Sequence, residues 1–230
     1  MNNGLLLLDK EPGLTSFQSL NVVKKTFSTR KVGHTGTLDK FASGILLVLV
    51  GSKAVKLASK FVGLNKEYTG TIFFGKETDT LDPEGAVIAE ANIPAKEEVE
   101  AVLPAFQGDI LQTPPAYSAL HIGGRRAHEL VREGKTPEMK QRPVRIFELT
   151  LLSWTPPQAK IRVLCSAGTY IRSLARDIAL AAGSRAFLSA LTRTAIGSFR
   201  LEDAVKGEAE SLLRSLLPLD SKIFEALKQP

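Results

Sequence analysis

The chain has 230 residues, of which 43% are hydrophobic and 23% are charged. This balance excludes a disordered chain, and no apolar run is long enough to span a bilayer. The 30 lysines and arginines outnumber the 24 aspartates and glutamates, and the net charge of +6 suits a polyanionic partner such as a nucleic acid. A single cysteine excludes an internal disulfide and is typical of the cytoplasm, where we expect the protein to act.

The first elements follow from the hydrophobic pattern. Residues 4–8 predict a buried strand, and residues 10–13 predict a turn. Thr15 and Gln18 have the spacing of a capping box, so a helix is expected to begin there. Its packing side is expected to start with Phe17, which opens a series of apolar residues at helical spacing.

Residues 31–44 predict a surface loop, because three glycines interrupt a stretch that is too polar for a core strand. Asp39 is the only carboxylate in this loop. Two lysines and His34 lie close to it in the sequence and favour its ionised form, so Asp39 is a candidate nucleophile or general base. The simpler alternative is a turn in which Asp39 binds its own backbone.

Strands and helices are interspersed in the rest of the chain without strict alternation. This order favours an α+β fold, with a mixed, mainly antiparallel sheet flanked by helices. Thr169 is expected to cap a helix that carries Arg172 in its first turn, where a cation needs an outside carboxylate partner. We expect further strands over residues 45–50, 67–74, 144–152, 160–165 and 194–199, and helices after Gly51 and over residues 96–106, 127–133, 169–182, 187–191 and 211–217.

Two further stretches suit a polyanionic partner that carries planar groups. Residues 125–145 hold seven basic residues against three acidic ones. Two of the three tyrosines, Tyr68 and Tyr170, lie at junctions where an aromatic ring can stack on a planar ligand. A surface role for the arginines and a packing role for the tyrosines are the structural alternatives. No cluster of metal-ligand spacing occurs, so no metal is expected.

Several ordered motifs resemble the bacterial tRNA pseudouridine synthase B family, and the resemblance covers roughly residues 4–220. The segment from Gly33 to Asp39, followed by Ala42-Ser43-Gly44, is similar to the active-site motif of that family. The other matching stretches are residues 4–16, 66–68, 112–134, 165–172 and 191–194.

The resemblance implies an isomerase that converts uridine to pseudouridine at position 55 in the T-arm of tRNA, by base flipping and without a cofactor. It implies that Asp39 is the catalytic nucleophile, directed at C1′ or at C6, and that Arg172 pairs with it. Tyr68 would stack on the target base and assist the proton that leaves C5, and His34 would take the place of the flipped base. Tyr170 and Leu191 would line the pocket, and the RNA backbone would be gripped by Arg125, Arg126, Arg132 and Lys135.

The same resemblance implies the pseudouridine synthase fold, with a sheet in two halves. We expect a single catalytic domain over residues 1–230, with an inserted RNA-gripping element at about 112–142 and a short tail at about 205–230. No PUA domain is expected, and the enzyme is expected to act as a monomer without guide RNA, protein partner or membrane. Glu11 and His121 depart from the residues usual in the family at these positions, and both could alter RNA contacts.

Three other functions remain open at this point. A non-catalytic RNA-binding module would hold tRNA without altering it. A pseudouridine synthase could also act on another RNA or inside a guide-RNA particle. A hydrolase that uses Asp39 is a third alternative, although no second carboxylate lies in the matching motifs.

Overall fold

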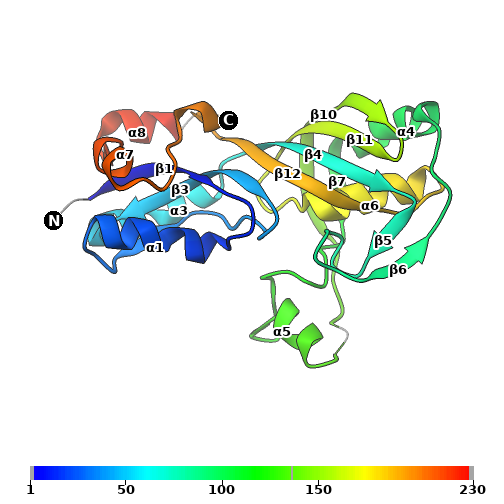
Figure 1. The fold of residues 1–230 in the computed structure, drawn as a ribbon, viewed down its shortest axis with the longest axis horizontal. Coiled ribbons are helices and arrows are strands. Elements are labelled where there is room, and N and C mark those ends of the chain that lie inside the picture. The colour runs from blue at the N-terminus through cyan, green and yellow to red at the C-terminus, as the bar shows by residue number, and fades with distance from the viewer. Residues whose placement is uncertain (1–2, 136, 228–230) are drawn as a thin grey trace. The chain divides into compact units, whose positions relative to one another are not determined.

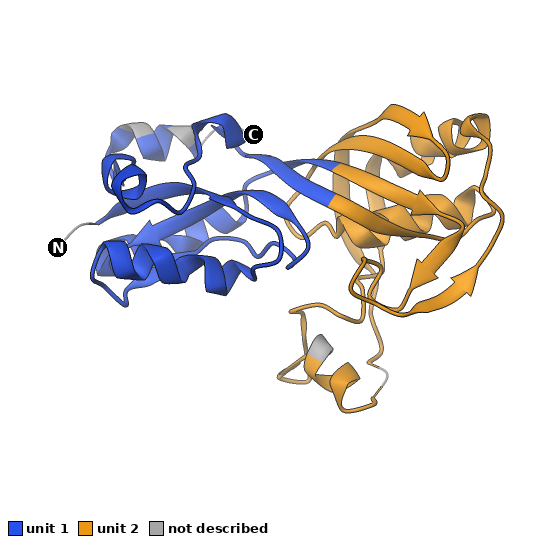
Figure 2. Ribbon diagram, in the orientation of Figure 1, with its two compact units in different colours: residues 1–69, 191–230 blue, residues 70–190 orange. Residues whose placement is uncertain are grey.

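The computed structural model describes residues 3–135 and 137–227. Two compact units are present (Figure 2): the first contains residues 1–69 and 191–230, and the second contains residues 70–190. Strands β4 (Lys66–Phe74) and β12 (Ala186–Ile196) each begin in one unit and end in the other. Both belong to a sheet with the order β14-β1-β3-β12-β4-β11-β10-β7 (Figure 1).

The sheet of the first unit is centred on β1 and β3, which are buried on both faces. Leu5, Leu7, Ile45 and their neighbours form one hydrophobic cluster with Phe61, whereas the alternating residues such as Leu6 face a second cluster. This two-faced burial follows from the period of two in a strand and explains the continuous apolar runs. Strands β1 and β3 pair antiparallel, and β3 pairs parallel with β12 at Ser43 and Gly44.

Short helices cover the two faces of this sheet. Thr15 and Gln18 form the predicted capping box of α1, which packs against α7. The elements of the first unit are β1 (Gly4–Lys10), α1 (Ser16–Thr26), β2 (Val32–His34), β3 (Ser43–Val50), α2 (Ser52–Val55), α3 (Ala58–Val62), β13 (Phe199–Arg200), η2 (Leu201–Asp203), α7 (Ala209–Arg214), β14 (Leu217–Pro218) and α8 (Ser221–Ala226), with parts of β4 and β12.

The second unit is built on antiparallel strands, with helix α6 buried along its apolar face. Ile171, Leu174 and Ile178 lie on that face, as their helical spacing predicts. Figure 1 shows α5 projecting from this unit. Its elements are β5 (Lys76–Thr78), β6 (Val87–Glu90), α4 (Lys96–Val102), η1 (Leu103–Phe106), β7 (Gly108–Gln112), β8 (His121–Ile122), β9 (Arg125–Arg126), α5 (Ala127–Arg132), β10 (Arg142–Thr155), β11 (Gln158–Cys165) and α6 (Ile171–Ala181).

The mainly antiparallel α+β fold is confirmed, and several local predictions are wrong. Residues 187–191 belong to strand β12 and not to a helix, and Phe187 stacks on Phe73 with ring centroids 5.2 Å apart. Phe17 points to solvent with 64% of its surface exposed, and Lys24 lies over its ring. Part of the predicted loop at 31–44 is strand β2, and the helix after Gly51 is divided into α2 and α3.

No helix within the described ranges is long and apolar enough to cross a membrane.

Candidate active site

In the first unit, the backbone on either side of Asp39 is held by buried side chains. The hydroxyl of Ser16 accepts a hydrogen bond from the N–H of Leu38 at 2.8 Å and donates one to its carbonyl at 3.0 Å. Lys10, which is 1% exposed, donates to the carbonyl of Ala42 at 2.6 Å. The N–H of Ala42 in turn donates to the carbonyl of Asp39 at 3.2 Å. The half-buried Asp39 is therefore presented by a fixed loop.

Arg193, also in the first unit, is buried beneath the same loop. Its Nε donates to the carbonyl of Ile45 at 2.8 Å, and its Nη2 donates to the carbonyl of Gly36 at 3.2 Å. The backbone of Arg193 runs so close to Gly44 that a Cβ there would meet its N and O atoms, and Gly44 has φ +109°. Glycine is required at this position because an L side chain would be both strained and blocked.

His34 ends strand β2 just before the loop. Burial, and secondarily the charge of Arg193, lowers the pKa of His34 below its usual value of 6.5. Its Nδ1 is buried without a hydrogen-bond partner among the described residues. Both effects favour the neutral form of the imidazole near pH 7.

Tyr68 and Leu191 belong to the same unit as Asp39. Tyr68 is 8% exposed on β4, and Leu191 is 7% exposed on β12. The two strands are neighbours in the sheet and are linked by a hydrogen bond of 2.8 Å from the Thr194 hydroxyl to Glu67. The structure therefore brings Asp39, His34, Tyr68 and Leu191 into one unit.

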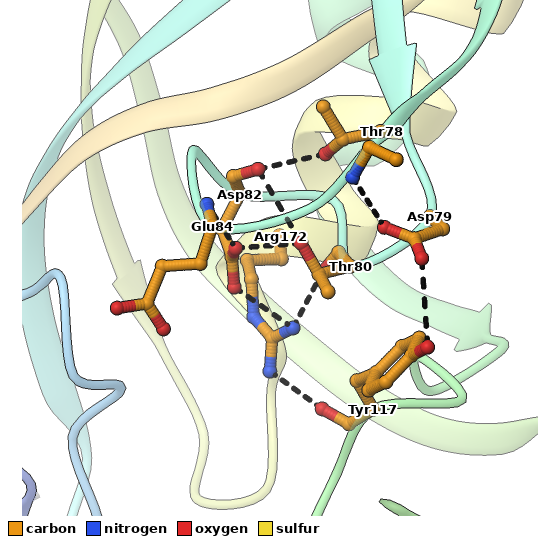
Figure 3. A network of polar contacts seen from close by, with 8 residues as sticks. Thr78, Asp79, Thr80, Asp82, Glu84, Tyr117 and Arg172 are labelled. Atoms are coloured by element: carbon orange, nitrogen blue, oxygen red, sulfur yellow. Dashed lines mark hydrogen bonds and ion pairs between the residues drawn. The ribbon is translucent and has the colours of Figure 1, made fainter. Parts of the chain in front are cut away.

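In the second unit, Arg172 is buried in a polar network with the loop between β5 and β6 (Figure 3). Its Nη1 lies 3.4 Å from Asp82 Oδ2 and donates to the Thr80 carbonyl at 2.6 Å, and its Nη2 donates to the Tyr117 carbonyl at 3.0 Å. The side chains of Arg172 and Asp82 are only 5% and 9% exposed. The general expectation that Arg172 has an outside carboxylate partner is met by Asp82, a residue that sequence reasoning missed. The pairing of Arg172 with Asp39 stays a prediction.

Asp82 is itself fixed by its own loop. Its Oδ1 accepts hydrogen bonds from the Thr80 hydroxyl at 2.6 Å and from the Glu84 N–H at 3.0 Å. These two hydrogen bonds fix the orientation of the Asp82 carboxylate. The ion pair with this fixed carboxylate in turn orients the guanidinium of Arg172. The sequence signal that could have found Asp82 is its place in a Thr-, Asp- and Gly-rich loop too polar for a strand.

Tyr170 is the residue before α6 and serves as its N-cap. The predicted cap, Thr169, is wrong, because its hydroxyl donates to the Ser166 carbonyl at 3.0 Å and the N-cap is the next residue. The side chain of Gln112 is hydrogen-bonded to the backbone of Tyr170.

The four predicted RNA-binding cations are exposed on β9, α5 and the turn that follows. Arg125 forms a two-pronged ion pair with Glu133, and Lys135 lies 3.0 Å from the same carboxylate. These hydrogen bonds, first from Arg125 and then from Lys135, lower the pKa of Glu133 to about 2. Arg126 is exposed at the end of β9, and Arg132 is exposed at the end of α5.

Similar solved structures identify the class of fold to which this chain belongs. In the crystal structure of a Cbf5-Nop10-Gar1 complex, one chain is 29% identical, with a TM-score of 0.69 over 88% of this chain and 52% of that one. The archaeal box H/ACA sRNP Nop10-Cbf5 complex shows the same fold at 24% identity and a TM-score of 0.69, over 98% of this chain and 61% of that one. The chain thus spans between half and two thirds of these longer proteins, and its fold is that of the pseudouridine synthases.

The sequence defines the family. The TruB family pseudouridylate synthase (N terminal domain) matches residues 24–171. The tRNA pseudouridine synthase B of Borrelia garinii is 48% identical over 96% of this chain and 80% of that protein. The protein of the same name from Francisella tularensis is 46% identical over 90% of this chain and 69% of that protein. The chain belongs to the TruB family of pseudouridylate synthases.

Proposed function

We propose that this chain isomerises uridine to pseudouridine at position 55 in the T-arm of tRNA. The observation that supports it best is the loop of Asp39, whose backbone is fixed by Ser16 and Lys10 and whose carboxylate is half-buried. The tRNA pseudouridine synthase B proteins of Borrelia and Francisella share almost half of its residues. RNA is therefore the substrate class, and a uridine is the group that reacts.

In this reaction Asp39 attacks as a nucleophile, at C1′ of the ribose or at C6 of the base. The bond from C1′ to N1 breaks, the base turns, and a bond from C1′ to C5 forms. The temporary bond to the Asp39 oxygen breaks before the product leaves, which returns the carboxylate. The proton that leaves C5 balances the one gained at N1, so no oxidant, reductant or cofactor is consumed. Arg172, oriented by Asp82, pairs with the attacking carboxylate.

The remaining residues handle the flipped base. Extrusion of a paired or stacked nucleotide costs a few kcal/mol, and stacking on Tyr68 together with insertion of neutral His34 offsets it. Tyr170 and Leu191 line the pocket, and Tyr68 assists removal of the proton at C5. The cations of the insertion, led by Arg125 and Arg126, contact phosphates of the T-arm. The two units act together as one catalytic domain, as a monomer without guide RNA.

The test is conversion of an unmodified tRNA transcript by the isolated protein with no cofactor added. Pseudouridine is mapped by carbodiimide labelling and primer extension for the parent, for Asp39→Asn, and for Asp203→Asn as an exposed control. We expect conversion at uridine 55 by the parent and the control, and none by Asp39→Asn although it still binds tRNA. Binding by the parent without conversion would instead support the RNA-binding module, and conversion at another uridine would reject position 55.

A further inference from the structure

Gln112, the last residue of β7, is joined to the start of helix α6 by its side chain. The amide oxygen accepts a hydrogen bond from the N–H of Tyr170 at 2.8 Å, and the amide nitrogen donates to the Tyr170 carbonyl at 3.1 Å. Gln112 is 1% exposed and lies 58 residues from its partner in the sequence. The amide oxygen and the amide nitrogen of one buried side chain thus both form hydrogen bonds with the backbone of a single residue.

These hydrogen bonds replace a local cap. A helix usually satisfies the N–H of its N-cap residue with a side chain from its own first turn. In α6 the side chain at that position, Ser173, instead donates to the Thr113 carbonyl at 2.8 Å, and Tyr170 receives no capping side chain from the helix. The backbone of Tyr170 therefore depends on a residue from another strand for its conformation.

The segment that follows Gln112 is attached to the same turn of α6. Ser173 donates to Thr113, and Arg172 donates to the Tyr117 carbonyl at 3.0 Å. The backbone of Tyr170, the side chain of Arg172 and the first residues of the RNA-gripping insertion thus meet at one place. A shift of Gln112 would move the backbone that carries both Tyr170 and Arg172.

We propose that Gln112 is a positioning residue for the reaction, which sets the backbone of Tyr170 and through it the orientation of Tyr170 and Arg172. Gln112 does not contact the uridine; it acts through the two hydrogen bonds to Tyr170. This inference rests on the function proposed above. It predicts a loss in the chemical step and not in tRNA binding, because the phosphate-binding cations lie elsewhere, on β9 and α5.

Two variants separate the two hydrogen bonds. Gln112→Met keeps the length of the side chain and removes both. Gln112→Glu keeps an oxygen for the Tyr170 N–H and places a second oxygen against the Tyr170 carbonyl, so only the donated bond is lost. Ser184→Ala is the matched control, since the buried Ser184 hydroxyl donates to the Asn92 carbonyl at 2.6 Å beyond the other end of α6.

The measurements are the single-turnover rate at saturating tRNA, the Kd for tRNA, and the folded fraction by circular dichroism, to which each rate is normalised. We expect both Gln112 variants to lose about 10-fold to 100-fold in rate, as is usual for misplaced catalytic groups. Their Kd should stay within about twofold of the parent, which separates the chemical step from binding. Ser184→Ala should keep the parent rate.

Parent rates in both Gln112 variants, a loss confined to Kd, or an equal loss in Ser184→Ala would each overturn the inference. A parent protein that binds tRNA without converting it would overturn the proposed function, and this inference with it. Conversion by the parent together with full activity of the Gln112 variants would reject the positioning role alone.

Discussion

At the scale of single residues, Ser16 shows how one buried hydroxyl can hold the loop that carries Asp39. It is 2% exposed and satisfies both backbone groups of Leu38, the residue before Asp39. A buried backbone group without a hydrogen-bond partner costs about 1–3 kcal/mol. Other positions of the loop would leave the N–H and the carbonyl of Leu38 unpaired, so the loop is held in place. Asp39 depends on Ser16 although the two residues do not need to touch.

Ser16→Ala should therefore lower both stability and catalysis. We expect the free energy of unfolding to fall by about 1–3 kcal/mol, and the single-turnover rate to fall about 10-fold or more, because Asp39 is misplaced. Urea unfolding and rapid-quench assays measure these two quantities. The control is Ser19→Ala on the same helix, whose buried hydroxyl donates only to the Thr15 carbonyl at 3.1 Å. A catalytic loss as large in Ser19→Ala would contradict the role given to Ser16.

His34 leads to a prediction about pH. Burial and the charge of Arg193 lower its pKa in the folded protein below 6.5, whereas the unfolded chain retains the ordinary value. Between these two values the unfolded chain binds more protons, so the free energy of unfolding should rise with pH in that window. His34→Gln should flatten this rise while matching the parent slope above pH 7. Urea unfolding at intervals from pH 5 to pH 8 measures it, and an unchanged slope in the variant would contradict the prediction.

Local patterns in the sequence point to some residues of the proposed site and miss others. Asp39 is predicted from its place as the only carboxylate in a glycine-punctuated loop, together with the family resemblance, and its catalytic role stays a prediction. Asp82 and Gln112 could not be predicted in this way, because their partners Arg172 and Tyr170 lie far along the chain and meet them only in the folded protein. A contact of this kind leaves no periodicity or spacing in the sequence.

At the scale of elements, the same limit explains the errors in secondary structure. Residues 187–191 form a short apolar run, which periodicity alone cannot assign to a helix or a strand. Pairing within the sheet and stacking of Phe187 on Phe73 determine that it is a strand. In contrast, α1, β1, β3 and β4 were predicted nearly to their ends, because each has either a complete capping box or a sustained hydrophobic pattern.

The ion pair of Arg172 and Asp82 connects three elements: helix α6, the loop after β5, and the segment that contains Tyr117. Asp82→Asn preserves the shape of the side chain and the oxygen that accepts from Thr80, but leaves the buried guanidinium without a full countercharge. Removing one partner of a buried pair costs about 3–5 kcal/mol. We expect a stability loss at the lower end of that range, since the carbonyls of Thr80 and Tyr117 still accept from Arg172.

The rate of pseudouridine formation should fall at least about 10-fold in Asp82→Asn, because Arg172 is no longer oriented. Chemical denaturation and single-turnover kinetics give the two values. Asp79→Asn provides the control in the same loop, because it makes the same change of charge. Asp79 accepts from the Ala86 N–H and, at 3.4 Å, from the Tyr117 hydroxyl, and not from Arg172. The shape and the oxygen of asparagine largely preserve these contacts. If Asp79→Asn were as damaging, the charge of the loop and not the pairing with Arg172 would be responsible.

At the scale of the whole molecule, strands β4 and β12 bear on whether the two units unfold together or separately. Each strand passes from one unit to the other without a break, and the two strands are neighbours in the sheet. Unfolding one unit would remove the hydrogen-bonding partners at the ends of both strands, and buried backbone groups must remain paired. The chain should therefore unfold as one cooperative system, in accordance with a single catalytic domain.

Equilibrium unfolding in urea, followed by two probes, tests this prediction. The single tryptophan, Trp154, lies in the second unit, edge-on to Phe74 with ring centroids 5.5 Å apart, so its fluorescence reports that unit. Far-ultraviolet circular dichroism reports both units together. We expect one transition with the same midpoint by both probes, which is the criterion of two-state behaviour. A fluorescence transition that precedes or follows the dichroism transition would show that the units unfold separately, and the single-domain proposal would then be wrong.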